Sequence, residues 1–472
     1  MKEIMKRTKK KILLINPPGI SLGYNVGLCY LAANLKKHGF QVKIIDFLNR
    51  PGNEDERLLQ AKDYDVIGLS IKTLILDEAA RIMDKVKRIN PQAAIICGGV
   101  HISLDAANFM EEYPRCDVAF QKDSEESIVD FMRGNNISNI DGAVYRKDSE
   151  IIVNPKSNLL LDLDKLPFPD FDSFDIPLKE IGNYPLLTSR GCPYNCIYCT
   201  VQVVSKKWKP RAVENLITEL KQNRHRIKEF HIVDDNFTLR IDRIKEFCRR
   251  LIEEKLNLRW SCPNGIRADI MDQELVYLMK KSGCYLANLG IESADETVFK
   301  TINKGESLNE VIEAVKMLKK EGIIVIGNFI LGLPGSTYQI DMESVRKAKR
   351  MGLDVSLWYP LSLYPKTKVY DLAINDNNLR FIRDWKKGFK YNFKGKPILS
   401  FERKDYRGEE MIKAFFLANL KSKSYGILID PKKSLVTRAL DLLKIILKYD
   451  PLRVVNHSYN AFKILINFRK VY

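Results

Sequence analysis

Short β-rich runs alternate with amphipathic helical stretches from Lys11 onward, and this alternation most limits how the chain can fold. The first series includes the apolar runs KILLIN, QVKIID, DVIGLSI and AAIICGG, with loops and helical stretches between them. Strands and helices that alternate in this way form a parallel sheet with helices on both faces. The pattern therefore predicts an α/β fold that begins with a Rossmann-like, doubly wound parallel sheet over residues 1–150.

A second alternating series follows a Pro- and Asp-rich stretch at 161–177, which interrupts both periods and predicts an ordered linker over 151–180. Beyond the linker, six strands are expected at 185–189, 229–234, 259–262, 285–291, 323–330 and 355–360. Alternation with helices predicts a partial (β/α)6 barrel over 181–375, with functional residues at the carboxyl ends of its strands.

The remaining residues, 376–472, predict a mainly helical, basic C-terminal extension. Within it, 433–448 reads as an amphipathic helix that carries Leu435, Leu442 and Ile446 on its apolar face. Two roles of this face stay open. The helix either lies in a membrane interface with these side chains immersed, or packs on the barrel and closes its open side.

The net charge of +18 lies mainly at the two ends of the chain. Residues 1–11 contribute +5 and residues 421–472 contribute +8, which leaves +5 for the body. An enzyme that acts on nucleic acid more often carries its basic residues around the active-site mouth, so we expect no DNA partner. Charged ends have two open explanations, a peripheral contact with an anionic membrane or solubilising tails.

Nine cysteines at irregular spacing do not match the paired framework of a secreted protein, which indicates a reducing compartment. The N-terminal apolar run, Ile12–Ile15, is too short for a signal peptide. Nowhere does an apolar stretch approach the roughly 20 residues of a membrane span. We expect a cytoplasmic protein, either free or peripheral to a membrane.

Three cysteines gather in the loop after the first strand of the second series, in the run Arg190-Gly-Cys192-Pro-Tyr-Asn-Cys196-Ile-Tyr-Cys199. Thiolates are the usual ligands of iron–sulfur clusters, and three rather than four leave one iron open to another ligand. A structural zinc site is the alternative, but zinc normally takes four ligands, and no fourth Cys or His lies nearby in the sequence. The spacing therefore favours one iron–sulfur cluster.

At these residues the sequence resembles the radical S-adenosylmethionine (SAM) superfamily, whose C-x3-C-x2-C motif follows the first barrel strand. The aromatic residue that the family places before the last cysteine is Tyr198 here, and the resemblance covers about 185–370. It implies a [4Fe-4S] cluster on Cys192, Cys196 and Cys199 whose open iron binds the amino and carboxylate groups of SAM. Reduction then yields a 5′-deoxyadenosyl radical, with an external donor such as flavodoxin or ferredoxin as a partner.

The resemblance also implies SAM contacts at the strand ends. Asp234 and Asp235 stand where the family often has Gly-Gly-Glu, and either bind the SAM ammonium or cap a helix. Arg267 is expected to pair with the SAM carboxylate, with a solvated arginine as the alternative. Glu292 matches the position that contacts the ribose hydroxyls, unless it is a surface residue. Gly332, in the segment GNFILGLPG, matches the adenine side.

The N-terminal domain resembles the cobalamin-binding domain that is fused to many radical SAM enzymes. The resemblance rests on NPPG at 16–19, Gly68-Leu-Ser70 and Gly98-Gly99-Val-His101, and implies cobalamin contacts at Asn16, Pro17, Gly19, Ser70, Gly98, Gly99 and His101. The cobalt-ligating run D-x-H-x-x-G does not occur in the sequence, so His101 is predicted to line the nucleotide pocket or cap the next helix. The acidic G-E-G-E of related enzymes is replaced by Lys122-Asp-Ser-Glu125-Glu126.

The favoured activity is methylation of an unactivated carbon of a lipid or other small-molecule secondary metabolite. One SAM recharges cobalamin with a methyl group, and a second SAM supplies the radical that prepares the substrate. A cobalamin-dependent cyclase or rearrangement enzyme is the main alternative. A tRNA methylthiotransferase would need a second cluster, with Cys29, Cys97 and Cys116 as candidates, but Cys29 and Cys97 lie in apolar helix and strand runs.

Overall fold

The computed structural model describes residues 10–19, 23–157, 161–178, 183–382, 399–428, 434–454 and 457. The chain forms two compact units. The first contains the described residues up to Pro193 together with Thr200–Asp235, and the second contains Tyr194–Cys199 and the described residues from Asn236 onward. The basic residues at 2–9 and 463–470 lie outside the described residues. The two units are defined by contacts between segments, so they do not test the predicted domain limits at 150, 180 and 375. These limits stay a prediction.

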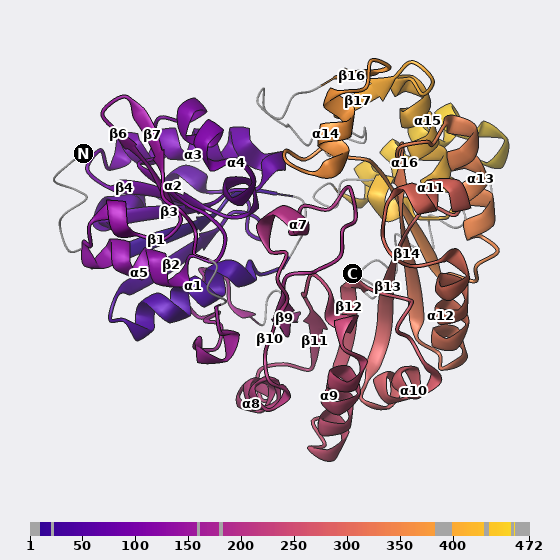
Figure 1. Ribbon diagram of the computed structural model, residues 1–472, viewed down its shortest axis with the longest axis horizontal. Coiled ribbons are helices and arrows are strands. Elements are labelled where there is room, and N and C mark those ends of the chain that lie inside the picture. The colour runs from indigo at the N-terminus through magenta and orange to yellow at the C-terminus, as the bar shows by residue number, and fades with distance from the viewer. Residues whose placement is uncertain are drawn as a thin grey trace. The chain divides into compact units, whose positions relative to one another are not determined.

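The first unit contains a seven-stranded sheet in the order β2-β1-β3-β4-β5-β6-β7 (Figure 1). Its first five strands are parallel, as the sequence predicts, and the order reverses between β1 and β3. Two antiparallel strands, β6 and β7, extend the sheet and were not predicted. The strands are β1 (Lys11–Asn16), β2 (Gln41–Asp46), β3 (Val66–Ser70), β4 (Ala94–Gly98), β5 (Val118–Phe120), β6 (Ala143–Lys147) and β7 (Glu150–Val153).

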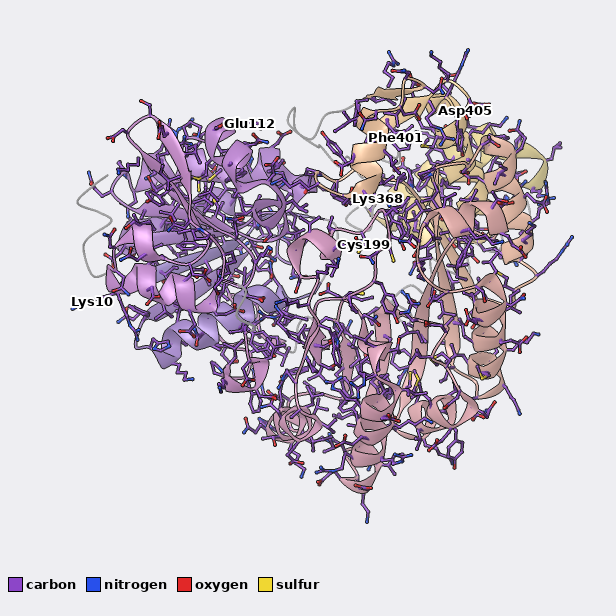
Figure 2. The ribbon with its side chains drawn as sticks, in the orientation of Figure 1. Lys10, Glu112, Cys199, Lys368, Phe401 and Asp405 are labelled. Atoms are coloured by element: carbon purple, nitrogen blue, oxygen red, sulfur yellow. The ribbon has the colours of Figure 1, made fainter. Side chains whose placement is uncertain are left out.

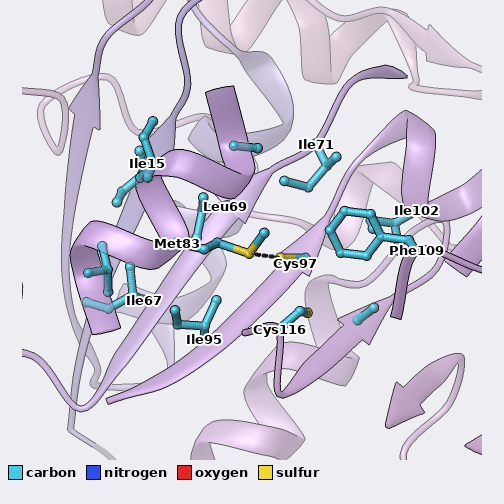
Figure 3. Close-up of a cluster of buried hydrophobic side chains, with 14 of the residues drawn as sticks. Ile15, Ile67, Leu69, Ile71, Met83, Ile95, Cys97, Ile102, Phe109 and Cys116 are labelled. Carbon is cyan, nitrogen blue, oxygen red and sulfur yellow. Dashed lines mark hydrogen bonds between the residues drawn. The ribbon is translucent and has the colours of Figure 1, made fainter. Parts of the chain in front are cut away.

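Helices cover both faces of this sheet, which explains why the central strands β1, β3 and β4 are almost entirely apolar and buried. On one face, α3 buries Ile82, Met83 and Val86 at helical spacing against β3 and β4 (Figure 3). On the other face, α1 and α5 pack together. The helices are α1 (Val26–Lys37), α2 (Glu54–Leu58), α3 (Leu76–Ile89), α4 (Val100–Glu112) and α5 (Glu125–Arg133). The Rossmann-like architecture is confirmed.

The second β/α series follows in the predicted order. Within the first unit β8 and β11 are parallel, and within the second unit β12, β13, β14 and β15 are parallel to their neighbours. The strands are β8 (Tyr184–Leu186), β11 (Glu229–Ile232), β12 (Arg259–Ile266), β13 (Cys284–Glu292), β14 (Ile324–Leu331) and β15 (Val355–Pro360). The helices between them are α8 (Val213–Asn223), α9 (Ile241–Glu253), α10 (Gln273–Lys281), α11 (Glu296–Thr301), α12 (Leu308–Lys320) and α13 (Tyr338–Ala348).

Shorter elements flank the loops at the strand ends. A two-residue strand, β9 (Ser189–Arg190), pairs with β10 (Lys209–Pro210), and the helix α7 (Val201–Val204) lies between them in the chain. In the second unit α14 (Lys368–Ile374) follows β15. The hairpin of β16 (Leu379–Phe381) and β17 (Phe401–Arg403) and the helices α15 (Gly408–Lys421) and α16 (Leu435–Tyr449) complete the C-terminal part.

The C-terminal helix α16 is amphipathic as predicted, and of the two roles left open for its predicted apolar face the structure shows packing, on α15. Leu442 and Ile446 are each only 1% exposed, so they cannot be immersed in a bilayer. They lie on the side that packs against α15, where the rings of Phe416 and Tyr449 stack 4.4 Å apart. The side chain of Leu435 lies outside the described part of the chain. Among the described helices, none is long and apolar enough to cross a membrane.

Candidate active site

The loop of three cysteines is the centre of the candidate site. Cys192, Cys196 and Cys199 are partly exposed, whereas the other six cysteines of the chain are buried. The backbone of the loop is anchored at several points, since the Cys192 amide donates to the Ser205 carbonyl at 3.1 Å and the Ile197 amide donates to the Ile302 carbonyl at 3.1 Å. An ordered loop that leaves its thiols accessible fits a bound iron–sulfur cluster.

Within the second unit, the end of the loop is held by the start of α14. The Val369 amide donates to the Ile197 carbonyl at 2.9 Å, so the segment that ends at Cys199 runs next to the start of α14 at Lys368 (Figure 2). Among the described residues, no group of three or more His, Cys, Asp or Glu side chains is close enough to hold a single metal ion. A [4Fe-4S] cluster does not need its three cysteines to meet at one metal ion, because each cysteine binds a different iron.

The turn into the loop depends on Gly191. Its backbone has a φ of +86°, and a Cβ placed there would clash with the carbonyl oxygens of Ser205 and Lys207. Only glycine can adopt this conformation without strain in so little space. The run Arg-Gly-Cys is therefore explained by the geometry of the turn.

Both carboxylates after β11 hold this turn. Asp234 is buried and accepts hydrogen bonds from the Thr188 amide at 2.6 Å and the Ser189 hydroxyl at 2.7 Å. Burial raises the pKa of its carboxyl group, while these hydrogen bonds lower it. Asp235 accepts a hydrogen bond from the Gly191 amide at 2.8 Å. The SAM-ammonium role of both residues stays a prediction, and their contacts within the protein position the start of the cysteine loop.

Within the second unit, Tyr198 and Glu292 are in contact, and both are residues for which a SAM contact is predicted. The Tyr198 hydroxyl donates to Glu292 Oε1 at 2.8 Å. Glu292 ends β13 with a φ of +65°, which is rare for a residue other than glycine and concentrates at functional sites. Burial raises the pKa of its carboxyl group, and the ammonium group of Lys304 lowers it. A buried carboxylate held in this way is not a surface glutamate.

One further feature near Glu292 fits a bound polar ligand such as SAM. Gly290 only makes room for the Glu292 carboxylate, because a Cβ there would lie 2.5 Å from Glu292 Oε1. Two residues earlier on the same face of the strand, Asn288 is 7% exposed, and its Oδ1 is buried without a hydrogen-bond partner in the described structure. A buried acceptor of this kind is normally satisfied. Asn288 was not predicted, because an asparagine inside a strand carries no local signal of function.

Arg267 and Gly332, two further residues predicted to contact SAM, lie against other residues of the chain. The Arg267 guanidinium donates to Asp269 at 3.0 and 2.8 Å and to the carbonyls of Lys304 at 2.7 Å and Gly305 at 3.1 Å. Gly332 has a φ of +78°, and a Cβ there would lie 2.8 Å from the Met411 side chain on α15. The SAM contacts assigned to both residues stay predictions.

The predicted cobalamin residues lie at the carboxyl ends of β1, β3 and β4. Asn25 joins two of them, donating to Asn16 Oδ1 at 3.2 Å and to Ser70 Oγ at 2.9 Å, and Asn16 in turn donates to Asp46 at 3.0 Å. Asn25 was missed, although an asparagine immediately before an apolar helix is a recognisable N-cap. Pro17 and Gly19 follow Asn16 in the same loop.

Gly98 ends β4, Gly99 is the residue that precedes α4, and His101 lies in the first turn of α4. Gly99 has a φ of +104°, and a Cβ there would lie 2.7 Å from the Ile71 carbonyl oxygen. The glycine therefore lets the backbone pass close to Ile71, which follows β3. His101 is 1% exposed, with its Nδ1 3.1 Å from the Thr73 hydroxyl. Burial lowers the pKa of His101 to about 4, so the imidazole is neutral at pH 7. Its contact with the nucleotide pocket stays a prediction.

The cysteines proposed for a second cluster belong to the core of the first unit. Cys97 contacts Met83, with 3.7 Å between the sulfur atoms, and Cys116 lies in the same cluster (Figure 3). Burial raises the pKa of the Cys29 and Cys97 thiols well above the ordinary value, so both are protonated. Buried, protonated thiols do not serve as cluster ligands, which argues against the methylthiotransferase reading.

Fold and site together define an α/β enzyme in which a Rossmann-like domain precedes β/α units with a three-thiol loop. Two family models match the chain, the Radical SAM superfamily over residues 186–357 and the B12 binding domain over residues 19–131. The chain thus contains both a radical SAM domain and a B12-binding domain, and its cofactors are a [4Fe-4S] cluster, SAM and cobalamin.

Similar proteins agree with this assignment. An uncharacterized methyltransferase of Pyrococcus horikoshii is 29% identical over 80% of this chain and 86% of its own length. An anaerobic magnesium-protoporphyrin IX monomethyl ester cyclase of Rubrivivax gelatinosus is 25% identical over 76% of this chain and 69% of its own length. The radical SAM methyltransferase TsrM of Kitasatospora setae has the same fold, with a TM-score of 0.75 and 15% identity over 96% of this chain and 99% of its own.

Proposed function

We propose that this enzyme transfers a methyl group from SAM, by way of cobalamin, to an unactivated carbon of a small molecule or lipid. The proposal rests on one observation, the presence of the three-cysteine loop and the cobalamin-type domain in a single chain. The similarity to a methyltransferase over most of both chains supports it. When bound, the cluster supplies the electron that splits SAM into methionine and a 5′-deoxyadenosyl radical, and cobalamin carries the methyl group.

The residues of the chain bind and orient the reactants. Cys192, Cys196 and Cys199 hold the cluster, and an external donor of the flavodoxin or ferredoxin type delivers the electron. Glu292, fixed by the Tyr198 hydroxyl, accepts hydrogen bonds from the ribose hydroxyls of SAM. The unpartnered Asn288 Oδ1 on the same strand accepts one from a second polar donor of SAM or substrate.

The test supplies the reconstituted enzyme with cobalamin, a flavodoxin reducing system, an extract of the source cells and SAM labelled in its methyl group. We expect one small molecule or lipid to gain a labelled methyl group on carbon and 5′-deoxyadenosine to accumulate. A preparation without cobalamin is the control and should give no labelled product. Transfer of the label to nitrogen or oxygen without any 5′-deoxyadenosine would contradict the proposal.

A cyclase or rearrangement activity is the second candidate, favoured by the similarity to the anaerobic magnesium-protoporphyrin IX monomethyl ester cyclase. The same experiment separates the two activities. A cyclase forms 5′-deoxyadenosine and a product that has lost hydrogen, but it leaves the label on SAM or methionine.

We also propose that α16 docks on an anionic membrane, by a different face from the one that carries Leu442 and Ile446. An apolar stripe runs along the exposed side at spacings of four, three and four residues, with exposures of 69, 53, 38 and 53%, namely Val436, Leu440, Leu443 and Leu447. Basic residues accompany it, including Lys444, Lys448 and Arg453. An exposed apolar stripe with basic neighbours fits a lipid interface with anionic headgroups, each basic contact adding about 1 kcal/mol.

Vesicle sedimentation tests the docking. The wild-type chain is expected to sediment with phosphatidylserine-containing vesicles at low salt and to be released at high salt. A variant with Leu440→Asn and Leu447→Asn should not sediment, whereas Leu59→Asn, which alters an equally exposed leucine elsewhere, should behave like wild type. Substitution is preferable to truncation, because removal of α16 would uncover Phe416. Equal sedimentation of the double variant and wild type, or none by wild type, would remove the proposal.

A further inference from the structure

The side chain of Tyr194, inside the cysteine motif, is covered by a guanidinium group. The Arg267 Cζ atom lies 3.5 Å from the centroid of the Tyr194 ring, and both residues belong to the second unit. Arginine stacks on aromatic faces because the planar cation interacts with the negative face of the ring. Tyr194 lies two residues after Cys192 and two before Cys196, so this contact acts directly on the loop that carries the ligands.

The guanidinium is itself held in a fixed plane. Four of its five N–H groups donate to protein oxygens, two to Asp269 and one each to the carbonyls of Lys304 and Gly305. Arg267 is 5% exposed, and the buried carboxylate of Glu306 lies 3.5 Å from its Nε. These contacts fix the plane of the Arg267 guanidinium against the Tyr194 ring.

The turn at 302–306 completes the frame around the same loop. The Ile302 carbonyl accepts a hydrogen bond from the Ile197 amide at 3.1 Å, and the Asn303 side chain donates to the Asn195 carbonyl at 3.3 Å. Gly305 faces both partners of the stack, since a Cβ there would lie 3.8 Å from Arg267 and 4.0 Å from Tyr194. One rigid turn thus fixes the guanidinium, the tyrosine and the backbone on either side of Cys196.

We infer that Arg267 is a positioning residue for the cluster, which acts through Tyr194 to fix the segment that carries Cys196 and Cys199, and not a ligand of the SAM carboxylate. The inference rests on the cluster cofactor but not on methyl transfer. Groups that orient metal ligands from behind typically change metal affinity or activity by about 10- to 100-fold when they are removed. The effect is expected on the cluster even when no SAM is present.

The test measures the cluster in the full-length chain after anaerobic reconstitution. Tyr194→Leu removes the ring, Tyr194→Phe keeps it, and Arg267→Lys keeps the charge but loses the flat fork of donors. We expect a chelator to strip iron about tenfold faster from Tyr194→Leu and from Arg267→Lys than from wild type. The electron paramagnetic resonance signal of their reduced clusters should broaden without SAM, while Tyr194→Phe stays close to wild type.

A matched arginine–tyrosine pair at the other end of β12 serves as the control. Arg259, at the start of β12, stacks on Tyr285 with 4.3 Å between its Cζ and the ring centroid, at the opposite end of the strand from Arg267. Tyr285→Leu should leave the rate of iron loss and the signal unchanged. Because Tyr194 is only partly buried, Tyr194→Leu is expected to fold, which circular dichroism checks. It therefore remains decisive even if Arg267→Lys does not fold.

Two results would overturn the inference. The first is a Tyr194→Leu cluster with wild-type iron loss and an unchanged signal. The second is an Arg267→Lys variant with a normal cluster in the absence of SAM but weakened SAM binding, as a carboxylate ligand predicts. Failure of methyl transfer would appear instead as a wild-type protein that holds its cluster and cleaves SAM but labels no product.

Discussion

A chain in which Cys192, Cys196 and Cys199 are all alanine is expected to hold no [4Fe-4S] cluster and to cleave no SAM. The two losses should occur together, because the cluster both binds SAM at its open iron and delivers the electron. Iron and sulfide analysis after anaerobic reconstitution measures the first loss, and the yield of 5′-deoxyadenosine measures the second. The expected yield falls below detection.

The buried cysteines of the same chain provide the control. Cys248→Ala changes a cysteine on the buried side of α9, where burial raises the pKa of the thiol to about 12. It should keep a full cluster and normal SAM cleavage, at some cost in stability. A triple variant that still binds four irons per chain would show that other residues hold the cluster, and the assignment of the site would fail.

The order of strands and helices could be predicted because it depends on local periodicity. Apolar runs such as Ile12–Ile15 alternate with amphipathic helices along the chain, and nothing distant is needed to read them. The cysteine motif was equally local. Its turn at Gly191 shows why the glycine is there, but the clash with the 205–207 carbonyls becomes visible only in the folded chain.

Partners of the acidic residues could not be predicted, because they come from distant segments. The sequence placed Asp234 at the end of a strand but gave no sign that it holds Thr188 and Ser189, more than 40 residues earlier. In the same way the pattern of α16 showed one apolar face, whereas the helix has two. Only packing decides that Leu442 faces α15 and Leu440 faces outward.

The burial of Glu219 could not be predicted, since a glutamate in an amphipathic helix is normally a surface residue. In the first unit it is fully buried and pairs with Arg211 at 2.6 Å, and the Tyr184 hydroxyl donates to it at 2.6 Å. Arg211 in turn donates to the Tyr30 hydroxyl of α1 at 3.1 Å. Buried charge therefore joins the cobalamin-type sheet to the first β/α unit of the radical SAM series.

Removing one member of this pair is expected to destabilise the first unit strongly. Glu219→Gln leaves the Arg211 charge buried without its counterion, and Arg211→Met leaves the Glu219 charge, so each should lower the free energy of unfolding by about 3–5 kcal/mol. For a unit of roughly 200 residues, where 1 kcal/mol shifts the melting temperature by about 2–4 °C, the drop is about 6–20 °C. Thermal unfolding followed by circular dichroism measures it.

The double variant Arg211→Met with Glu219→Leu separates the pair energy from the cost of burial. With both charges gone, no unpaired ion remains in the interior, and we expect stability to return to within about 1–2 kcal/mol of wild type. The exposed pair Arg115–Asp84, 3.0 Å apart, is the control, because Asp84→Asn should cost at most about 1 kcal/mol. Single variants that melt like wild type, or a double variant less stable than either single one, would show that the pair does not hold this part of the molecule together.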